Sequence, residues 1–382
     1  MMRFVRPLLL ILTSTIAVIL ASILWSACSP DVNEVVGSEE VISVADVLRS
    51  APNDDFETIN GPPDLSFPRD HGPHRKQQIE WWYYTGNLKA ENGDLFGFQL
   101  TFFRIGLTPE AVDRPSLWAA NESFMAHFAL TDVARQEFYS SERLSRGSMG
   151  LAGAEATPFR VWTESWSAVG NPGSTFPMKL QAADRGVELS LSLTQEKPRV
   201  LQGDQGYSRK GKDVGNASGY VSHTRLSAAG SIVAAGRKFT VTGSAWMDHE
   251  WSTSVLDEGL VGWDWFSLHL DDGRELMLYQ LRDEDGSSSE FSAGAMIDVD
   301  GKKQALKRSD FVIQVKDTWT SPRTGRRYPA RWILEVPTLS IRLEVEPLLA
   351  DQELQVSVNY WEGAVRAKGT TTASGYVELV GY

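Results

Sequence analysis

Alternating apolar and polar positions run through most of the chain beyond about residue 60. In residues 94–103, DLFGFQLTFF, every second position is apolar, namely Phe96, Phe98, Leu100 and Phe102. The same period of two recurs in residues 275–283, ELMLYQLRD, and 339–349, LSIRLEVEPLL. Because successive side chains of a strand point to opposite faces, this pattern predicts strands with one apolar face.

Turn signals separate these expected strands. Asn92-Gly93, Asp272-Gly273 and Asp300-Gly301 each stand between two such runs, and Asx-Gly pairs favour tight hairpins. Helical stretches are few and short, with residues 45–49 and 141–146 as the candidates. The pattern predicts an all-β protein built as sandwiches or up-and-down barrels, without alternating βαβ units.

Two segments of the chain weakly resemble each other. Residues 80–104 and 262–282 both pass from an aromatic run through an Asx-Gly turn into an alternating run that ends in arginine. Together with a length of 382 residues, this echo suggests two related antiparallel barrels in tandem, dividing near residues 251–262.

The N-terminus has the features of a secretory signal. Two arginines precede an apolar run over residues 7–24, and small residues lead to Cys28, the only cysteine of the chain. We expect residues 1–27 to be a lipoprotein signal and Cys28 to receive the lipid, although a retained transmembrane helix is the alternative. Residues 28–60 are expected to be a flexible acidic linker. The protein would then be extracytoplasmic and membrane-anchored, facing the periplasm from the outer membrane in a Gram-negative host.

Net charge and missing motifs exclude several function classes. A net charge of -12 argues against nucleic acid, which requires a basic face. No G-x-S-x-G elbow or phosphate-binding glycine loop is present, so neither a lipase-type hydrolase nor a bound nucleotide cofactor is expected. His71 and His74 have a spacing that a metal could use, but without a local third ligand we expect solvated histidines, and no metal.

Carboxylates and histidines set among tryptophans remain as candidate chemistry. In residues 245–252, AWMDHEWS, a strand would place Trp246, Asp248 and Glu250 on one face, opposite His249 and Trp251. In residues 262–270, Trp263, Trp265 and His269 would share a face opposite Asp264. A catalytic triad of Ser208, His223 and Asp248 is a weaker alternative, since the fold would have to bring these distant residues together.

Desolvation against indole rings raises the pKa of a carboxyl group, so such a group can hold a proton near neutral pH and act as a general acid. Aromatic faces can also stabilise a developing cation. A protonated carboxyl group beside aromatic faces suits protonation of an electron-rich alkene, followed by capture of the carbocation by water. The alternative is purely structural, with tryptophans filling a barrel end and carboxylates bonding to backbone or arginine.

Several strings resemble one family. FPRDHGPHRKQQIEWWYYTGNL, GDQGYSRKG, NASGYVSHTRL, GSAWMDHEWS, YWEGAV and GYVELVGY, in this order, are similar to the carotenoid 1,2-hydratase and AttH-like family. The resemblance implies two tandem lipocalin-like antiparallel β-barrels with few short helices, over residues 61–252 and 253–382. The family's D-H-x-W motif matches Asp248, His249 and Trp251, and its hydratases are thought to protonate a terminal isoprenoid double bond with an aspartate.

We therefore expect a cavity for an apolar, isoprenoid or lipid-like molecule. Its catalytic candidates are Asp248, His249, Glu250 and Asp264. Its expected ligand contacts are Glu80, Trp82, Tyr84, His127, Trp246, Trp251, Trp263 and Trp265. Three functions compete: an acid-catalysed hydratase or hydrolase, a non-catalytic lipocalin-type lipid carrier, and a lipoprotein accessory of an ABC exporter permease.

Overall fold

The computed structural model describes residues 55–110, 116–253, 256–257 and 259–382. Cys28, the expected signal and most of the expected linker lie outside these residues, as does the helix candidate at residues 45–49. Within the described part, no helix has both the length and the apolar character needed to cross a bilayer.

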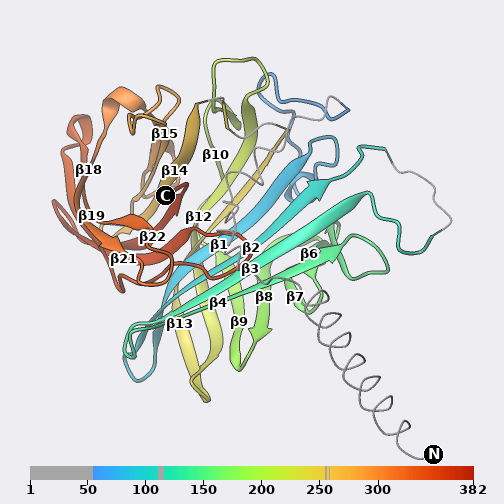
Figure 1. Ribbon diagram of the computed structural model, residues 1–382, viewed down its shortest axis with the longest axis horizontal. Helices are drawn as coiled ribbons and strands as arrows, with labels where there is room; N and C mark the ends of the chain where they lie inside the picture. Colours follow the sequence, from blue (N-terminus) through green and yellow to red (C-terminus); the bar gives the residue numbers. More distant parts are fainter. Residues whose placement is uncertain (1–54, 111–115, 254–255, 258) are drawn as a thin grey trace, which may run out of the picture. The chain divides into compact units, whose positions relative to one another are not determined.

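The first sheet contains 13 antiparallel strands, of which 11 follow one another in the order β4-β3-β2-β1-β13-β12-β9-β8-β7-β6-β5 and curl into a nearly closed barrel (Figure 1). Short strands β10 and β11 pair with β12 outside this path. The strands are β1 (Ile79–Ala90), β2 (Leu95–Gly106), β3 (Glu122–Asp132), β4 (Glu137–Arg146), β5 (Ala152–Ala156), β6 (Phe159–Thr163), β7 (Trp166–Asn171), β8 (Ser174–Asp184), β9 (Val187–Gln195), β10 (Val200–Leu201), β11 (Tyr207–Arg209), β12 (Ala217–Ala234) and β13 (Arg237–Ser252).

The second sheet contains 9 antiparallel strands in the order β17-β16-β15-β14-β22-β21-β20-β19-β18 and forms a curled half-barrel, orange to red in Figure 1. Its strands are β14 (Leu260–Leu270), β15 (Glu275–Asp283), β16 (Ala293–Ile297), β17 (Lys303–Lys307), β18 (Val312–Thr320), β19 (Arg327–Val336), β20 (Ile341–Pro347), β21 (Trp361–Gly369) and β22 (Ala373–Val380). The prediction of an all-β protein is confirmed.

Helical structure in the described residues is limited to three 3-10 turns, η1 (Arg69–His71), η2 (Arg308–Asp310) and η3 (Pro337–Leu339). The expected helix at residues 141–146 is wrong, since these residues form the second half of β4. Pairing with β3 along its whole length holds β4 extended and overrides the local helical preference.

The hairpins predicted from Asx-Gly pairs are confirmed. Gly93, Gly273 and Gly301 have φ of 93°, 87° and 85° and connect β1 to β2, β14 to β15 and β16 to β17. Glycine occupies this left-handed region without the clash that a Cβ would cause. The two similar segments form the hairpins β1-β2 and β14-β15, which occupy equivalent places in the two sheet orders.

The three larger apolar cores of the described residues arise because central strands are buried on both faces. Along β1, Trp82 and Tyr84 point into the first barrel, whereas Trp81 and Tyr83 point into a core between the sheets. Along β14, Trp263 and Trp265 face that middle core and Phe266 faces the second half-barrel. Alternation therefore assigns neighbouring residues of one strand to different cores.

The two sheets contact each other through β1 and β2 on one side and β21 and β22 on the other. Asn87 donates a hydrogen bond to the carbonyl of Gly375 across this contact, at 2.9 Å. A Cβ on Gly97 would lie 2.4 Å from the Cβ of Ala364, so glycine is what permits this close approach.

Candidate functional site

A small cavity of about 70 Å³ lies in the core between the two sheets. A cavity of this size holds only a few water molecules. Its apolar walls include Trp81, Tyr83, Phe103, Trp263, Trp265 and Tyr279, and its polar groups are Lys210, Tyr220, Asp248, Glu250 and Glu378. Acidic groups and aromatic faces therefore share one small cavity, to which chain segments far apart in sequence contribute.

Asp248 lies at the centre of a hydrogen-bond network on β13. Its Oδ2 accepts from the hydroxyl of Tyr220 at 2.6 Å, and its Oδ1 accepts from Ser222 at 2.5 Å and from the indole of Trp246 at 2.7 Å. Burial raises the pKa of Asp248 to about 7, although these three hydrogen bonds favour the carboxylate. Near neutral pH this group can therefore either hold or release a proton.

Glu250, two residues further along the same face, forms an ion pair. Its Oε1 lies 3.0 Å from the ammonium group of Lys210, and the hydroxyl of Ser218 donates to the same oxygen. Burial alone would lower the pKa of Lys210, but the charge and hydrogen bond of Glu250, together with Tyr279 and Asp248, outweigh burial and the pKa is raised. The ammonium also lies 4.3 Å from the ring centroid of Tyr279, so the cavity contains a fixed cation beside aromatic faces.

A second pair of acids comes from β21 and β22, where Glu362 and Glu378 stand opposite each other. Burial and the nearby charges of Glu250 and Asp248 raise the pKa of Glu378 to about 8, against a hydrogen bond from Trp263. Glu362 is fully buried and accepts from the hydroxyl of Tyr83 at 2.7 Å, and burial raises its pKa well above the ordinary range. Both acids therefore bind their protons more tightly than an exposed glutamate does.

The predicted faces of both central strands are confirmed. Asp248 and Glu250 line the cavity together with Trp263 and Trp265, and Trp246 supports Asp248 from behind. Asp264 lies on the opposite face of β14, where it binds Arg282 at 3.0 Å and accepts from the hydroxyl of Tyr382 at 2.8 Å. The structure does not bring Asp264 to the cavity.

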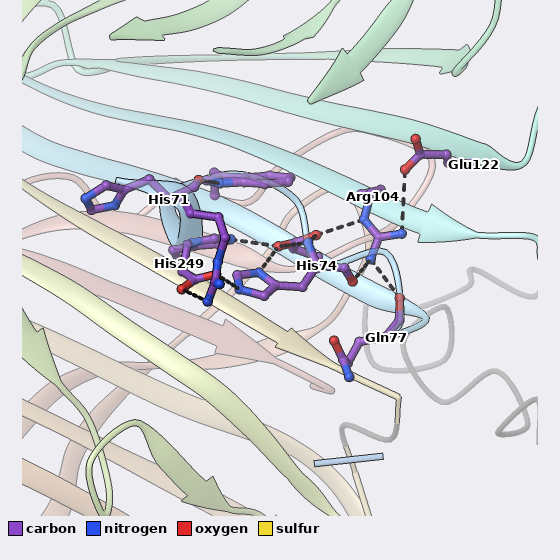
Figure 2. A network of polar contacts seen from close by, with 10 residues as sticks. His71, His74, Gln77, Arg104, Glu122 and His249 are labelled. Atoms are coloured by element: carbon purple, nitrogen blue, oxygen red, sulfur yellow. Dashed lines mark hydrogen bonds and ion pairs between the residues drawn. The ribbon is translucent and has the colours of Figure 1, made fainter. Parts of the chain in front are cut away.

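A second polar network lies in the first sheet, where β1, β2 and β13 run side by side (Figure 2). Glu80 accepts from His74 Nδ1 and from His249 Nε2 at 2.8 Å each, and from Arg104 Nε at 2.8 Å. Burial would raise the pKa of Glu80, but Arg104 and the two imidazoles hold it well below the ordinary range. His74 stacks on Trp251 with ring centroids 3.7 Å apart.

His74, Glu80 and His249 have ligand atoms within 4.8 Å of one another, as a metal ion would require. The sequence predicts no metal at His71 and His74. Two imidazoles and one carboxylate are donors that zinc accepts. However, each of these atoms already makes a short hydrogen bond, and Arg104 places a positive charge on the same carboxylate. The geometry is that of a buried, hydrogen-bonded ion cluster.

Two expectations about histidine are wrong. His71 is buried and His74 is half-buried instead of solvated. The turn η1 folds against the first barrel, where Trp82 donates to the carbonyl of His71 at 3.0 Å, and His74 stacks on Trp251. The alternative triad does not form either. Ser208 contacts the hydroxyl of Tyr279 at 3.3 Å, and neither ring nitrogen of His223 has a partner among the described residues. The serine beside Asp248 is Ser222.

The remaining expected ligand contacts lie away from the cavity. Trp82 and Tyr84 fill the first barrel. Glu80 accepts hydrogen bonds from His74, His249 and Arg104, and Trp251 stacks on His74. His127 binds the hydroxyl of Tyr360 at 2.7 Å between the sheets. As a donor to Glu80, His249 faces away from the neighbouring Asp248.

The sequence did not predict the cavity residues Tyr83, Lys210, Tyr220, Tyr279 and Glu378, nor Ser222 and Glu362, which hydrogen-bond to Asp248 and Tyr83. A signal for Glu378 was present, because it is a lone carboxylate between Val377 and Leu379 in an apolar strand. For Lys210 and Tyr220 the only signal was their position in the strings GDQGYSRKG and NASGYVSHTRL.

Comparisons with known proteins agree with this architecture. A family profile described as AttH-like matches residues 58–382. The crystal structure of a protein assigned as AttH from Nitrosomonas europaea is 34% identical, with 85% of this chain and 99% of that chain covered and a TM-score of 0.76. Kievitone hydratase from Nectria haematococca is 14% identical over 86% of this chain and 95% of its own, with a TM-score of 0.62. CghA with Sch210972 is 14% identical over 89% of this chain and 97% of its own, with a TM-score of 0.47. The comparison with curated proteins gave no match.

Proposed function

The chain belongs to the AttH-like family, and from that premise we propose that the cavity between its sheets receives the end of an apolar, isoprenoid-like molecule and protonates it from Asp248. The observation that carries this proposal is a carboxyl group whose pKa is raised to about 7, located in a buried space walled by indole and phenol rings. A general acid works best when its pKa lies near the operating pH.

The reaction is addition of water to a carbon–carbon double bond. The proton of the Asp248 carboxyl group moves to one alkene carbon, and the π electrons form the new C–H bond. The neighbouring carbon becomes a cation that the faces of Trp263 and Trp265 stabilise. Water forms the C–O bond and loses a proton to the Asp248 carboxylate, which restores the acid. A hydratase of the same fold supports this reaction class.

The size of the cavity limits what can react. A space of about 70 Å³ has room for a small terminal group, so the body of a long polyene would lie outside it. The substrate class is therefore a molecule with a terminal, electron-rich double bond. We also propose that Cys28 anchors the protein to a membrane, which would keep it near molecules of this kind.

The experiment compares wild type with Asp248→Asn on a panel of acyclic isoprenoid alkenes, with transfer of isotope-labelled water oxygen to product measured by mass spectrometry. Loss of general acid catalysis should reduce the rate by roughly two to four orders of magnitude. Asp264→Asn is the matched control, since Asp264 is a buried carboxylate outside the cavity. If that control fails to fold, Tyr382→Phe, which removes only a hydrogen bond to Asp264, replaces it.

If Asp248→Asn hydrates the alkenes as fast as wild type, Asp248 is not the general acid. Saturable binding of the alkenes by wild type with no product would contradict the hydratase and support the carrier.

A further inference from the structure

An open groove of about 810 Å³ lies at the seam of the first barrel. The two ends of the sheet path, β4 and β5, each have only one paired neighbour, and the groove is lined by the end of β4 and by the residue before β5. Its volume falls in the range of about 300–1,000 Å³ that is usual for small-molecule sites. This groove is separate from the cavity that contains Asp248, and the two share no lining residue.

One side of the groove is apolar and unusually exposed. Phe124 and Ile105 form part of its lining, and the large side chains of Trp118, Leu144 and Leu151 are 59%, 59% and 40% exposed. Isolated exposed apolar residues are ordinary, but several that line one concave surface indicate a binding site.

The same groove carries polar groups that lack partners. The hydroxyl of Ser148, a residue only 8% exposed, makes no hydrogen bond with any group in the described part of the chain. Arg146 is exposed and forms no ion pair with a described carboxylate, whereas Glu164, the groove's acidic residue, is paired with Arg143 at 3.2 Å. A buried hydroxyl without a partner is unfavourable until a ligand or water satisfies it.

We propose that this groove binds a free, anionic amphiphile with a single acyl chain. The acyl chain of the ligand lies against Trp118, Leu144 and Phe124. Its carboxylate or phosphate group accepts hydrogen bonds from Arg146 and from the hydroxyl of Ser148. The ligand class follows from charge complementarity, because the unpaired charge of the groove is positive while its walls are apolar. An uncharged terpene would leave both polar groups without a partner.

The test uses cis-parinaric acid, a fluorescent fatty acid, titrated into the full chain. Wild type should bind it saturably with one site, and Trp118→Ala and Arg146→Glu should each raise Kd by about tenfold or more. Lys238→Glu, an exposed cation on the β12-β13 hairpin, is the matched control and should leave Kd unchanged. Parinarate methyl ester, which lacks the charge, should bind wild type and Arg146→Glu alike.

Parinarate binding that is absent, or unchanged in both groove variants, would overturn the proposal. So would cosedimentation with anionic vesicles that depends on Trp118 without saturable parinarate binding, because the groove would then be a bilayer contact. Asp248→Asn should leave Kd unchanged, so failure here and failure of the hydratase proposal are separate results.

Discussion

Trp246 donates its indole N–H to the carboxylate of Asp248 at 2.7 Å, and the two side chains leave β13 on the same face. Residues two apart on a strand always share a face, so this contact is local in origin. It also affects the chemistry of the acid, because the indole N–H stabilises the carboxylate while the burial of Asp248 favours the protonated form. The first two predictions concern the proton that this arrangement holds.

Asp248→Asn should make stability less dependent on pH. A carboxyl group with a folded-state pKa of about 7 binds its proton more tightly than in the unfolded chain, where the pKa is about 4. Its contribution is therefore favourable below pH 4 and is lost as pH rises to about 7, at about 1.4 kcal/mol per pH unit. Urea unfolding of wild type and variant between pH 4 and 8 measures this slope, and parallel curves would show that Asp248 is ionised throughout.

Tyr220→Phe should raise the pKa of Asp248 further. The phenol hydrogen bond at 2.6 Å stabilises the carboxylate, so its removal favours the protonated acid. The measurement is an infrared titration of the protonated carboxyl band, with Asp248→Asn as the reference that lacks it. If the titration midpoint of Asp248 falls or stays constant in Tyr220→Phe, the Tyr220 hydroxyl does not donate to the Asp248 carboxylate.

Lys210→Met should destabilise the fold by roughly 3–5 kcal/mol, because it leaves the buried carboxylate of Glu250 without its cation. The double variant Lys210→Met with Glu250→Gln should recover much of this loss, since no unpaired charge remains. Free energies of unfolding in urea provide the comparison. Additive effects of the two substitutions would indicate that the pair is not coupled.

Glu80→Gln should also lower the free energy of unfolding by roughly 3–5 kcal/mol, because Arg104 would lose its buried counter-ion. Glu57→Gln is the matched control, as its ion pair with Lys76 is exposed and such pairs contribute about 0–1 kcal/mol. Chemical denaturation compares the two variants. Similar small losses in both would show that the network of Figure 2 adds little to stability.

Cys28→Ser should abolish labelling by a palmitate analogue in the native host and leave an unprocessed precursor. The reason is that the chain has no other cysteine to receive lipid. The measurement is gel mobility with in-cell labelling. Continued labelling of the variant would contradict the lipoprotein prediction, which rests on sequence alone.

Sequence alone determined the local geometry. Period-two alternation and Asx-Gly turns identified the hairpins, and they correctly placed Trp246, Asp248 and Glu250 on one face. The same rule separated Asp264 from Trp263 and Trp265, although only the fold showed which of the two faces lines a cavity. These features depend on neighbouring residues and on the fixed pleat of a strand, so a short segment suffices to specify them.

Tertiary structure decided what surrounds each acid. Glu378 reaches the neighbourhood of Asp248 and Glu250 from β22, Tyr220 from β12 and Lys210 from the segment between β11 and β12. Of the two histidines expected in solvent, His71 is buried and His74 half-buried. A pKa or an ion pair depends on burial and on charges within a few ångströms, whatever their separation along the chain. The sheet orders set those distances, and alternation within a segment carries no information about which strands become neighbours.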